Sequence, residues 1–408
     1  MAMSVAEKVQ ESVGYYSEVW KNAGTRIAPF LTETSVFDKR RNMSEFSKSV
    51  SDLKSCMARR PKSTSDGIPQ EWNEDMKTGI TAFSRTLLRL KDPELQRLLL
   101  GASIDSADRF AAESGKYDPG MVFDDIFQAM RNVWIMNVLQ IIAGVPVEYA
   151  KPIFAYSLLY PYTDNFLDDP EIPVPEKERF NARLSKRLNG ELLAPEIDLE
   201  VKVFGLLQMI EEVYPRESFA DVYESILCIQ DAQIKSLVQQ KRGIRSYEQT
   251  LAISAEKGGT SVLADCFLVC GHPGDRLIRF SAGFGFLLQL IDDLEDIAAD
   301  RTAGNATVFS SAQTKEELSD AVLRLIVFLH TALDYENASP VPYTGEIRTL
   351  FERNCMNLIY EAVFKNKDLF EKKLIRLLTK YSPFRPSYFA RLKQEIAPLL
   401  HSFGKNPA

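Results

Sequence analysis

The sequence predicts an all-α protein, and three observations support that prediction. Apolar residues recur at three- and four-residue steps through most of the chain, which is the period of an amphipathic helix. Almost no segment shows the apolar–polar alternation of a half-buried strand. Residues 121–144 are apolar on nearly every face, so their helix belongs in a core that other helices surround.

Gly, Pro and polar stretches divide the helical pattern into elements. Residues 1–60 predict two or three amphipathic helices, and residues 58–72 (ARRPKSTSDGIPQEW) predict a linker or long loop. We therefore expect an N-terminal helical extension, residues 1–72, followed by an α-helical domain, residues 73–408. Further helices are predicted at 74–115, 121–144, 151–169, 176–190, 197–213, 217–242, 246–270, 274–302, 314–335, 345–365, 367–380 and 386–402.

Composition and charge exclude several classes of protein. The chain has 408 residues and a net charge of −7, so it lacks the basic surplus that neutralises nucleic-acid phosphates. Its five cysteines are scattered, which fits a reducing cytosol better than a disulfide framework or a zinc site. The first residues do not form a signal peptide, and no apolar run is long enough for a transmembrane helix. These features predict a cytoplasmic protein.

An acidic stretch at Phe286–Arg301 (FLLQLIDDLEDIAADR) is the strongest functional signal. No Pro or Gly interrupts it, so it predicts one helix with an apolar stripe. Asp292, Asp296 and Asp300 recur every four residues and therefore stack on one face. Stacked like charges cost stability unless a cation offsets them, and carboxylate oxygens are ligands that Mg²⁺ prefers. A solvated acidic turn at a helix end is the alternative.

A second acidic cluster ends another apolar helix, in Tyr160–Asp169 (YPYTDNFLDD). Asp164 and Asp168 are again four residues apart. Two facing acid sets at the mouth of a helical cavity can hold Mg²⁺ ions that grip a diphosphate. The metal then makes diphosphate a good leaving group, and an apolar cavity holds the attached hydrocarbon.

These residues resemble the class I isoprenoid synthase superfamily. LQLIDDLED, at 288–296, is similar to the second aspartate-rich motif of trans-polyprenyl diphosphate synthases. DNFLD, at 164–168, is similar to their first motif with Asn at its second position. Between them, SYEQTLAISAEKGGTS resembles the segment that places a diphosphate-binding lysine, here Lys257. The resemblance covers roughly residues 120–310, and it implies a single-domain helical bundle around a central apolar cavity.

Departures from the elongating synthases favour a terpene synthase. The basic Gly-Lys-Arg element that precedes the first motif is absent, and prolines follow that motif where an Arg pair is expected, with Arg179 and Arg183 further on. The acids at 292, 296 and 300 are similar to the triad of class I terpene synthases. By this resemblance, Arg301 is the adjacent basic residue, and Arg242 or Arg245 is the diphosphate sensor.

The resulting prediction is a Mg²⁺-dependent class I terpene synthase that ionises a linear C15–C25 prenyl diphosphate. The resemblance implies three Mg²⁺ ions, with Mn²⁺ as a substitute, and a homodimer, which is usual among relatives. The alternative is a trans-prenyltransferase that condenses isopentenyl diphosphate with an allylic diphosphate, and a non-catalytic helical scaffold is a third interpretation.

The resemblance also assigns roles to individual residues. The predicted catalytic residues are Asp164, Asp168, Asp292 and Asp296. The predicted metal ligands are Asp164, Asp168, Asp292, Asp293, Asp296 and Asp300. The predicted diphosphate-binding residues are Arg242, Arg245, Lys257 and Arg301. Candidate cation-stabilising aromatics are Phe154, Tyr160, Tyr162, Phe166 and Phe284.

Structural interpretations of the same residues stay open. Lys257 precedes two glycines and can be a solvated residue at a helix break. Arg242 and Arg245 lie in KRGIRS, where a solvated loop is common, and Asp169 can be a turn acid beside Pro170. A di-iron carboxylate bundle is excluded, because it needs Glu-x-x-His pairs that the three histidines do not form.

Overall fold

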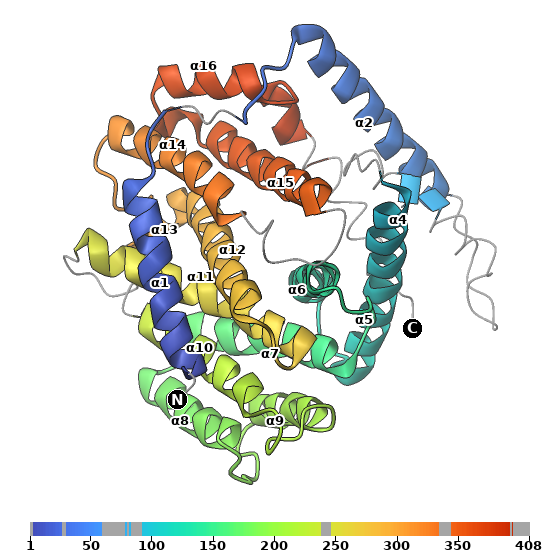
Figure 1. Cartoon of the computed structure of the whole chain (residues 1–408), viewed down its shortest axis with the longest axis vertical. Coiled ribbons are helices and arrows are strands. Elements are labelled where there is room, and N and C mark those ends of the chain that lie inside the picture. The colour runs from blue at the N-terminus through green and yellow to red at the C-terminus, as the bar shows by residue number, and fades with distance from the viewer. Residues whose placement is uncertain are drawn as a thin grey trace.

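A computed structural model confirms the all-α prediction (Figure 1). It describes residues 3–26, 30–58, 78–79, 81–82, 92–237, 246–333, 344–391 and 394, which form helices and connecting turns without a strand. Within these ranges no helix combines the length and the hydropathy that crossing a membrane requires.

In chain order the helices are α1 (Val5–Asn22), α2 (Val36–Ala58), α4 (Pro93–Gln96), the π-helical η1 (Arg97–Gly101), α5 (Ala102–Tyr117), α6 (Phe123–Ala143), α7 (Lys151–Asp168), α8 (Val174–Leu188), α9 (Asp198–Glu211), α10 (Ala220–Ser236), α11 (Tyr247–Cys270), α12 (Asp275–Glu295), α13 (Ile297–Ala303), α14 (Lys315–Ala332), α15 (Thr344–Lys365), the 3₁₀ turn η3 (Lys367–Leu369) and α16 (Lys372–Tyr381).

Helices α11 and α12 form the centre of the molecule (Figure 1). Helix α11 begins with a capping box, in which the Ser246 side chain accepts from the Gln249 backbone N–H and the Gln249 side chain accepts from that of Ser246. Its most extensive contacts are with α12 and α10. One group of buried apolar residues joins α12, α14, α15 and part of α1, and another joins α6, α7, α9 and α10. Both groups include residues of α11 and α12, so this pair links the two halves of the core.

Glycines allow α11 and α12 to approach very closely. A Cβ atom added to Gly285 would lie 2.1 Å from the Gly258 carbonyl oxygen, and one added to Gly258 would lie 2.5 Å from the Gly285 carbonyl oxygen. No larger residue fits at either position without separating the helices. This crossing sets the distance between the side chains that flank it on the two helices.

The N-terminal helix α1 is packed into the core. It contacts α10, α11, α12 and α14 (Figure 1). Trp20 is fully buried, and its indole N–H donates to the Tyr247 hydroxyl at 2.5 Å. The division into residues 1–72 and 73–408 stays a prediction, although α1 itself packs against the second of these parts.

Several helix boundaries differ from the sequence-based expectation. The helix predicted over 274–302 is interrupted at Asp296, which has φ −94° and ψ 9° and lies between α12 and α13. Asp296 donates its backbone N–H to Asp292 and accepts from that of Asp300, so one helix ends and the next begins at this residue. The segment predicted at 367–380 divides into η3 and α16. Most of residues 74–91 and 392–402 lie outside the described part of the chain.

Candidate active site

The first acidic set lies at the end of α7. The Asp164 carboxylate accepts a hydrogen bond from the Gln233 side-chain amide of α10 at 3.2 Å. The same oxygen lies 3.2 Å from the Lys257 amine of α11. Both partners of this ion pair are largely buried, with 16% of the Lys257 side chain and 18% of the Asp164 side chain exposed. Helices α7, α10 and α11 therefore meet at Asp164.

Asp168 and Asp169 close the same helix and differ in their surroundings. Asp168 is exposed, and its negative charge acts on both Lys257 and Tyr160. Asp169 accepts the backbone N–H of Glu171 at 2.9 Å and so stabilises the turn that follows. The charges of Asp168 and Asp164 thus act on the same lysine, whereas Asp169 stabilises its local turn.

Lys257 lies inside α11, which continues without a break to Cys270. The two glycines that follow Lys257 mark the close crossing with α12, so the interpretation of a helix break is wrong. Burial is the largest single influence on the pKa of the Lys257 amine and lowers it. The carboxylates of Asp164, Asp168 and Asp292 together outweigh that effect, and the pKa is raised. The amine is therefore firmly cationic.

The second acidic set lies at the end of α12, across the crossing from Lys257. The pKa of Asp292 is raised to about 6, first because surrounding protein atoms disfavour its charge and then because Asp296 repels it. Arg131 of α6 and Lys257 act in the opposite direction. Part of Asp292 remains exposed, so this carboxylate borders solvent and still interacts with both cations.

Asp300 belongs to the same electrostatic neighbourhood. Its pKa is raised by burial and by Asp296, while the Asn305 amide, which donates to it at 3.3 Å, and the charge of Lys257 act to lower it. Lys257 therefore interacts with acids from α7, α12 and α13. Four of the predicted acidic residues, Asp164, Asp168, Asp292 and Asp300, thus interact electrostatically with this one cation, and Asp296 acts on Asp292 and Asp300.

Asp293 is held differently from its neighbours. Only 5% of it is exposed, and its carboxylate accepts from Ser254 at 3.0 Å and from Gln289 at 2.8 Å. Burial is the main reason that its pKa rises to about 7. Both oxygens are thus engaged within the interface of α11 and α12, which makes Asp293 a structural acid rather than a ready metal ligand.

Among the predicted arginines, Arg301 is described by the structure, and it binds backbone oxygens. Arg301 donates to the carbonyl oxygens of Ser310 and Ala312, at 3.3 and 2.8 Å, and so stabilises the loop after α13. Arg242 and Arg245 lie outside the described residues. Arg131, which the motif search missed, is the arginine whose charge acts on Asp292. The signal that could have identified it is that it is the single basic residue of the largely apolar segment 121–144.

The five aromatic residues proposed to stabilise a carbocation differ in their surroundings. Tyr160 lies among the acids, because Asp164, Asp292 and Asp168 add to the effect of burial in raising its pKa. The other four pack elsewhere: Phe154 contacts Phe110 and Tyr117, Phe166 contacts Phe180, Phe284 contacts Phe280 and Phe351, and Tyr162 donates to Asp118.

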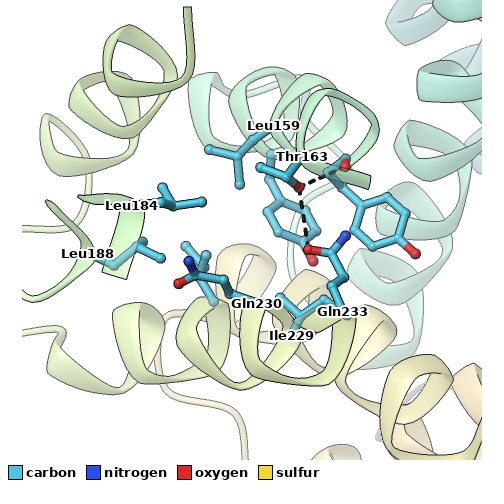
Figure 2. A pocket seen from close by; sticks show the side chains of 10 residues that line it. Leu159, Thr163, Leu184, Leu188, Ile229, Gln230 and Gln233 are labelled. Carbon is cyan, nitrogen blue, oxygen red and sulfur yellow. Dashed lines mark hydrogen bonds between the residues drawn. The ribbon is translucent and has the colours of Figure 1, made fainter. Parts of the chain in front are cut away.

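A pocket lies beside Asp164, between α7, α8 and α10 (Figure 2). Gln233, which donates to Asp164, forms part of its wall. The space in it that a water-sized molecule can occupy is about 10 Å³, which is room for about one water. The pocket therefore does not hold a chain of fifteen carbons, and the large central cavity implied by the family resemblance stays a prediction. Its residues are Tyr156, Leu159, Tyr160, Thr163, Leu184, Leu188, Ile226, Ile229, Gln230 and Gln233.

A buried acid on α11 was also missed by the motif search. Asp265 is fully buried, and one of its oxygens accepts from the Asn132 amide of α6 at 2.9 Å. Burial raises its pKa well above the ordinary range. A single acid within the apolar run SVLADCFLVC is the sequence signal for it.

The acidic residues suit a hard divalent cation in their chemistry. Among the described residues no three His, Cys, Asp or Glu side chains converge closely enough to hold a metal ion by themselves. Mg²⁺ is commonly held by one or two carboxylates together with waters and substrate phosphates. Asp164 and Asp168 on one side, and Asp292, Asp296 and Asp300 on the other, could supply such incomplete ligand sets.

Comparisons with known proteins do not place the chain in a family. No family model matches it, and neither a curated protein nor a solved structure shows a significant match. The functional argument therefore depends on the residues and their geometry.

Proposed function

We propose that the chain is a Mg²⁺-dependent class I terpene synthase that ionises a prenyl diphosphate and releases diphosphate. The observation that carries the proposal is the meeting of two acidic sets around one buried cation, Lys257. Lysine binds anions, whereas carboxylates bind cations. A ligand that suits both is an anion that carries bound divalent metal ions. A diphosphate has this character.

The roles of the residues follow from their positions. Lys257 binds a diphosphate oxygen and Arg131 adds a second positive charge from α6. Mg²⁺, when bound, would neutralise the charge that develops on the leaving diphosphate. Asp164 and Asp168 from α7, together with Asp292, Asp296 and Asp300, would hold these ions. Tyr160 presents a ring next to the position where positive charge is left on the hydrocarbon.

The ion pairs of α8 weigh against the prenyltransferase alternative. An elongating enzyme needs arginines after its first acidic motif for the acceptor diphosphate. Arg183 instead binds Glu200 at 2.6 Å and Glu196 at 2.9 Å, and Arg179 binds Glu196 at 2.5 Å. Only 2% of the Glu200 side chain is exposed. Arg183 neutralises a buried acid and Arg179 is paired with Glu196, so a single-substrate reaction is favoured.

The decisive experiment measures diphosphate release from C15, C20 and C25 prenyl diphosphates with Mg²⁺, with EDTA, and with added isopentenyl diphosphate. We expect Mg²⁺-dependent release, and a loss of roughly a hundredfold or more in kcat/KM for Asp164→Asn and for Lys257→Met. Asp169→Asn is the matched control, because an Asn side chain also accepts the Glu171 N–H.

Three results would contradict the proposal. Release that is unaffected by EDTA would exclude the metal, and release that is unchanged in Asp164→Asn would exclude this site. Longer products with isopentenyl diphosphate would establish elongation. If no substrate is turned over, calorimetry with inorganic diphosphate and Mg²⁺ decides between a binding site and the scaffold alternative.

A further inference from the structure

Helix α16 carries a basic face that is exposed to solvent. Its buried side consists of Leu374 and Leu378, which pack into the core. The residues on the opposite side recur at steps of one, three and four, so they share one face of the helix. All of them are exposed cations: Lys372, Lys373, Arg376 and Lys380.

The charge of this region contrasts with that of the whole chain. Residues 365–391 contain eight Lys or Arg and two acids, whereas the chain has a net charge of −7. On α16, Lys373 pairs with Glu371 at 2.8 Å, and Lys380 pairs with Glu33 at 2.5 Å. The other two cations of the face form no ion pair within the part of the chain that the structure describes: Lys372 and Arg376.

Exposed apolar side chains lie next to this basic face, at the start of α2. Val36 is 62% exposed and Phe37 is 73% exposed. Arg40 is also exposed and follows them by one helical turn, so the three residues share the outer face of α2. The Thr34 backbone N–H donates to the Lys380 carbonyl at 3.1 Å, which places the start of α2 beside the end of α16 (Figure 1).

We propose that the outer face of α16 and the start of α2 bind a membrane surface that contains anionic lipids. The apolar sides of both helices pack on the same buried group of residues, so both outer faces point away from it. Cations near an anionic leaflet are attracted to it, and exposed aromatic and aliphatic side chains enter the headgroup region. A soluble anion would use the cations but would leave Phe37 in water. The proposal does not depend on the reaction that occurs at Asp164.

The test measures sedimentation of the full chain with vesicles of phosphatidylcholine alone and with vesicles of phosphatidylcholine and phosphatidylserine. We expect binding to the mixed vesicles, and loss of most of it at about 1 M salt, where the screening length is about 3 Å. Each cation near an anionic surface contributes about a factor of five to the partition coefficient. Lys372→Gln therefore weakens binding about fivefold, and the double variant with Arg376→Gln weakens it about twenty-five-fold.

Two substitutions at the other end of the molecule are matched controls. Lys186 is exposed on α8, which lies opposite α16 along the long axis (Figure 1), so Lys186→Gln should bind like the wild type. Phe37→Ala should weaken binding roughly five- to tenfold, because its ring no longer leaves water. Leu192→Ala, at a 92% exposed residue after α8, should have no effect. All four side chains are exposed, so the midpoint of urea unfolding should not change in any variant.

Three results would overturn the proposal. The first is that the chain does not sediment with the mixed vesicles. The second is that Lys372→Gln and Lys186→Gln bind equally well, which would place the contact elsewhere. The third is that Phe37→Ala binds like the wild type while soluble polyphosphate binds the chain as tightly as the vesicles do. In that case the basic face recognises anions in solution rather than a membrane.

Discussion

Asp293 should make the stability of the chain depend on pH in a way that one substitution removes. Its carboxyl is buried between α11 and α12, and its pKa rises from 3.8 to about 7. Because folding raises this pKa, the folded state binds the proton more tightly than the unfolded state does. The stabilising contribution is fully present below about pH 4 and is lost as the pH rises through about 7. A shift of this size corresponds to about 4 kcal/mol.

The substitution Asp293→Asn isolates this contribution. An Asn oxygen can still accept from Gln289, and its amide can donate to the Ser254 hydroxyl, so the local hydrogen bonds are retained. We expect the wild type to lose about 4 kcal/mol relative to the variant between pH 4 and pH 8. Urea unfolding at closely spaced pH values, in EDTA, measures this difference directly.

Asp275→Asn is the matched control on the same helix. Asp275 is exposed and accepts from Lys8 at 2.8 Å, and its pKa is lowered by that hydrogen bond. Its contribution to stability has the opposite sign, because it is present above the unfolded pKa and lost in acid. If the stability difference between wild type and Asp293→Asn stays constant from pH 4 to pH 8, the assignment of a raised pKa to this carboxyl is wrong.

Three further substitutions, the first with a control, test the packing and a buried ion pair. Gly285→Ala should cost about 1–3 kcal/mol or more by forcing a Cβ against a carbonyl of α11, whereas Gly115→Ala, with nothing within 4 Å, should be neutral or stabilising by up to about 1 kcal/mol. Trp20→Ala should cost about 3–5 kcal/mol if α1 belongs to the core, and an ordinary surface effect would contradict that. Arg183→Met should cost about 3–5 kcal/mol by leaving Glu200 buried and unpaired, and unchanged stability would reopen a substrate-binding role for this arginine. Urea unfolding at neutral pH measures all three.

The fold class could be predicted from periodicity, but the exact course of the helices could not. The acids of Phe286–Arg301 follow a helical period, and helical structure does resume after Asp296. The bend at Asp296 leaves no trace in that pattern, because neither Pro nor Gly occurs within Phe286–Arg301. Similarly, a glycine pair in sequence indicates either a helix break or a close crossing. Only the position of Gly285 on the neighbouring helix distinguishes them.

The candidate site residues that could be predicted from the sequence are those that belong to a regularly spaced set of acids. Asp164 and Asp292 belong to spaced acidic sets, so the spacing alone marked them. Arg131 and Asp265 are single residues within apolar helices, and their importance appears only when α6, α7 and α11 are packed together. Spacing also could not separate Asp292 from Asp293. The two are adjacent in sequence, yet one borders solvent and the other points into the helix interface.

The position of Lys257 explains how the two acidic sets can lie close together. These carboxylates repel one another, and the protein atoms packed around Asp292 add to the cost of its charge. One buried amine reduces that repulsion because it acts on acids of α7, α12 and α13 simultaneously. The glycine crossing keeps the amine within range of these acids, since a larger residue at either glycine would move α11 away from α12. The close packing of two helices and the charge balance of the site are thus consequences of the same three residues, Lys257, Gly258 and Gly285.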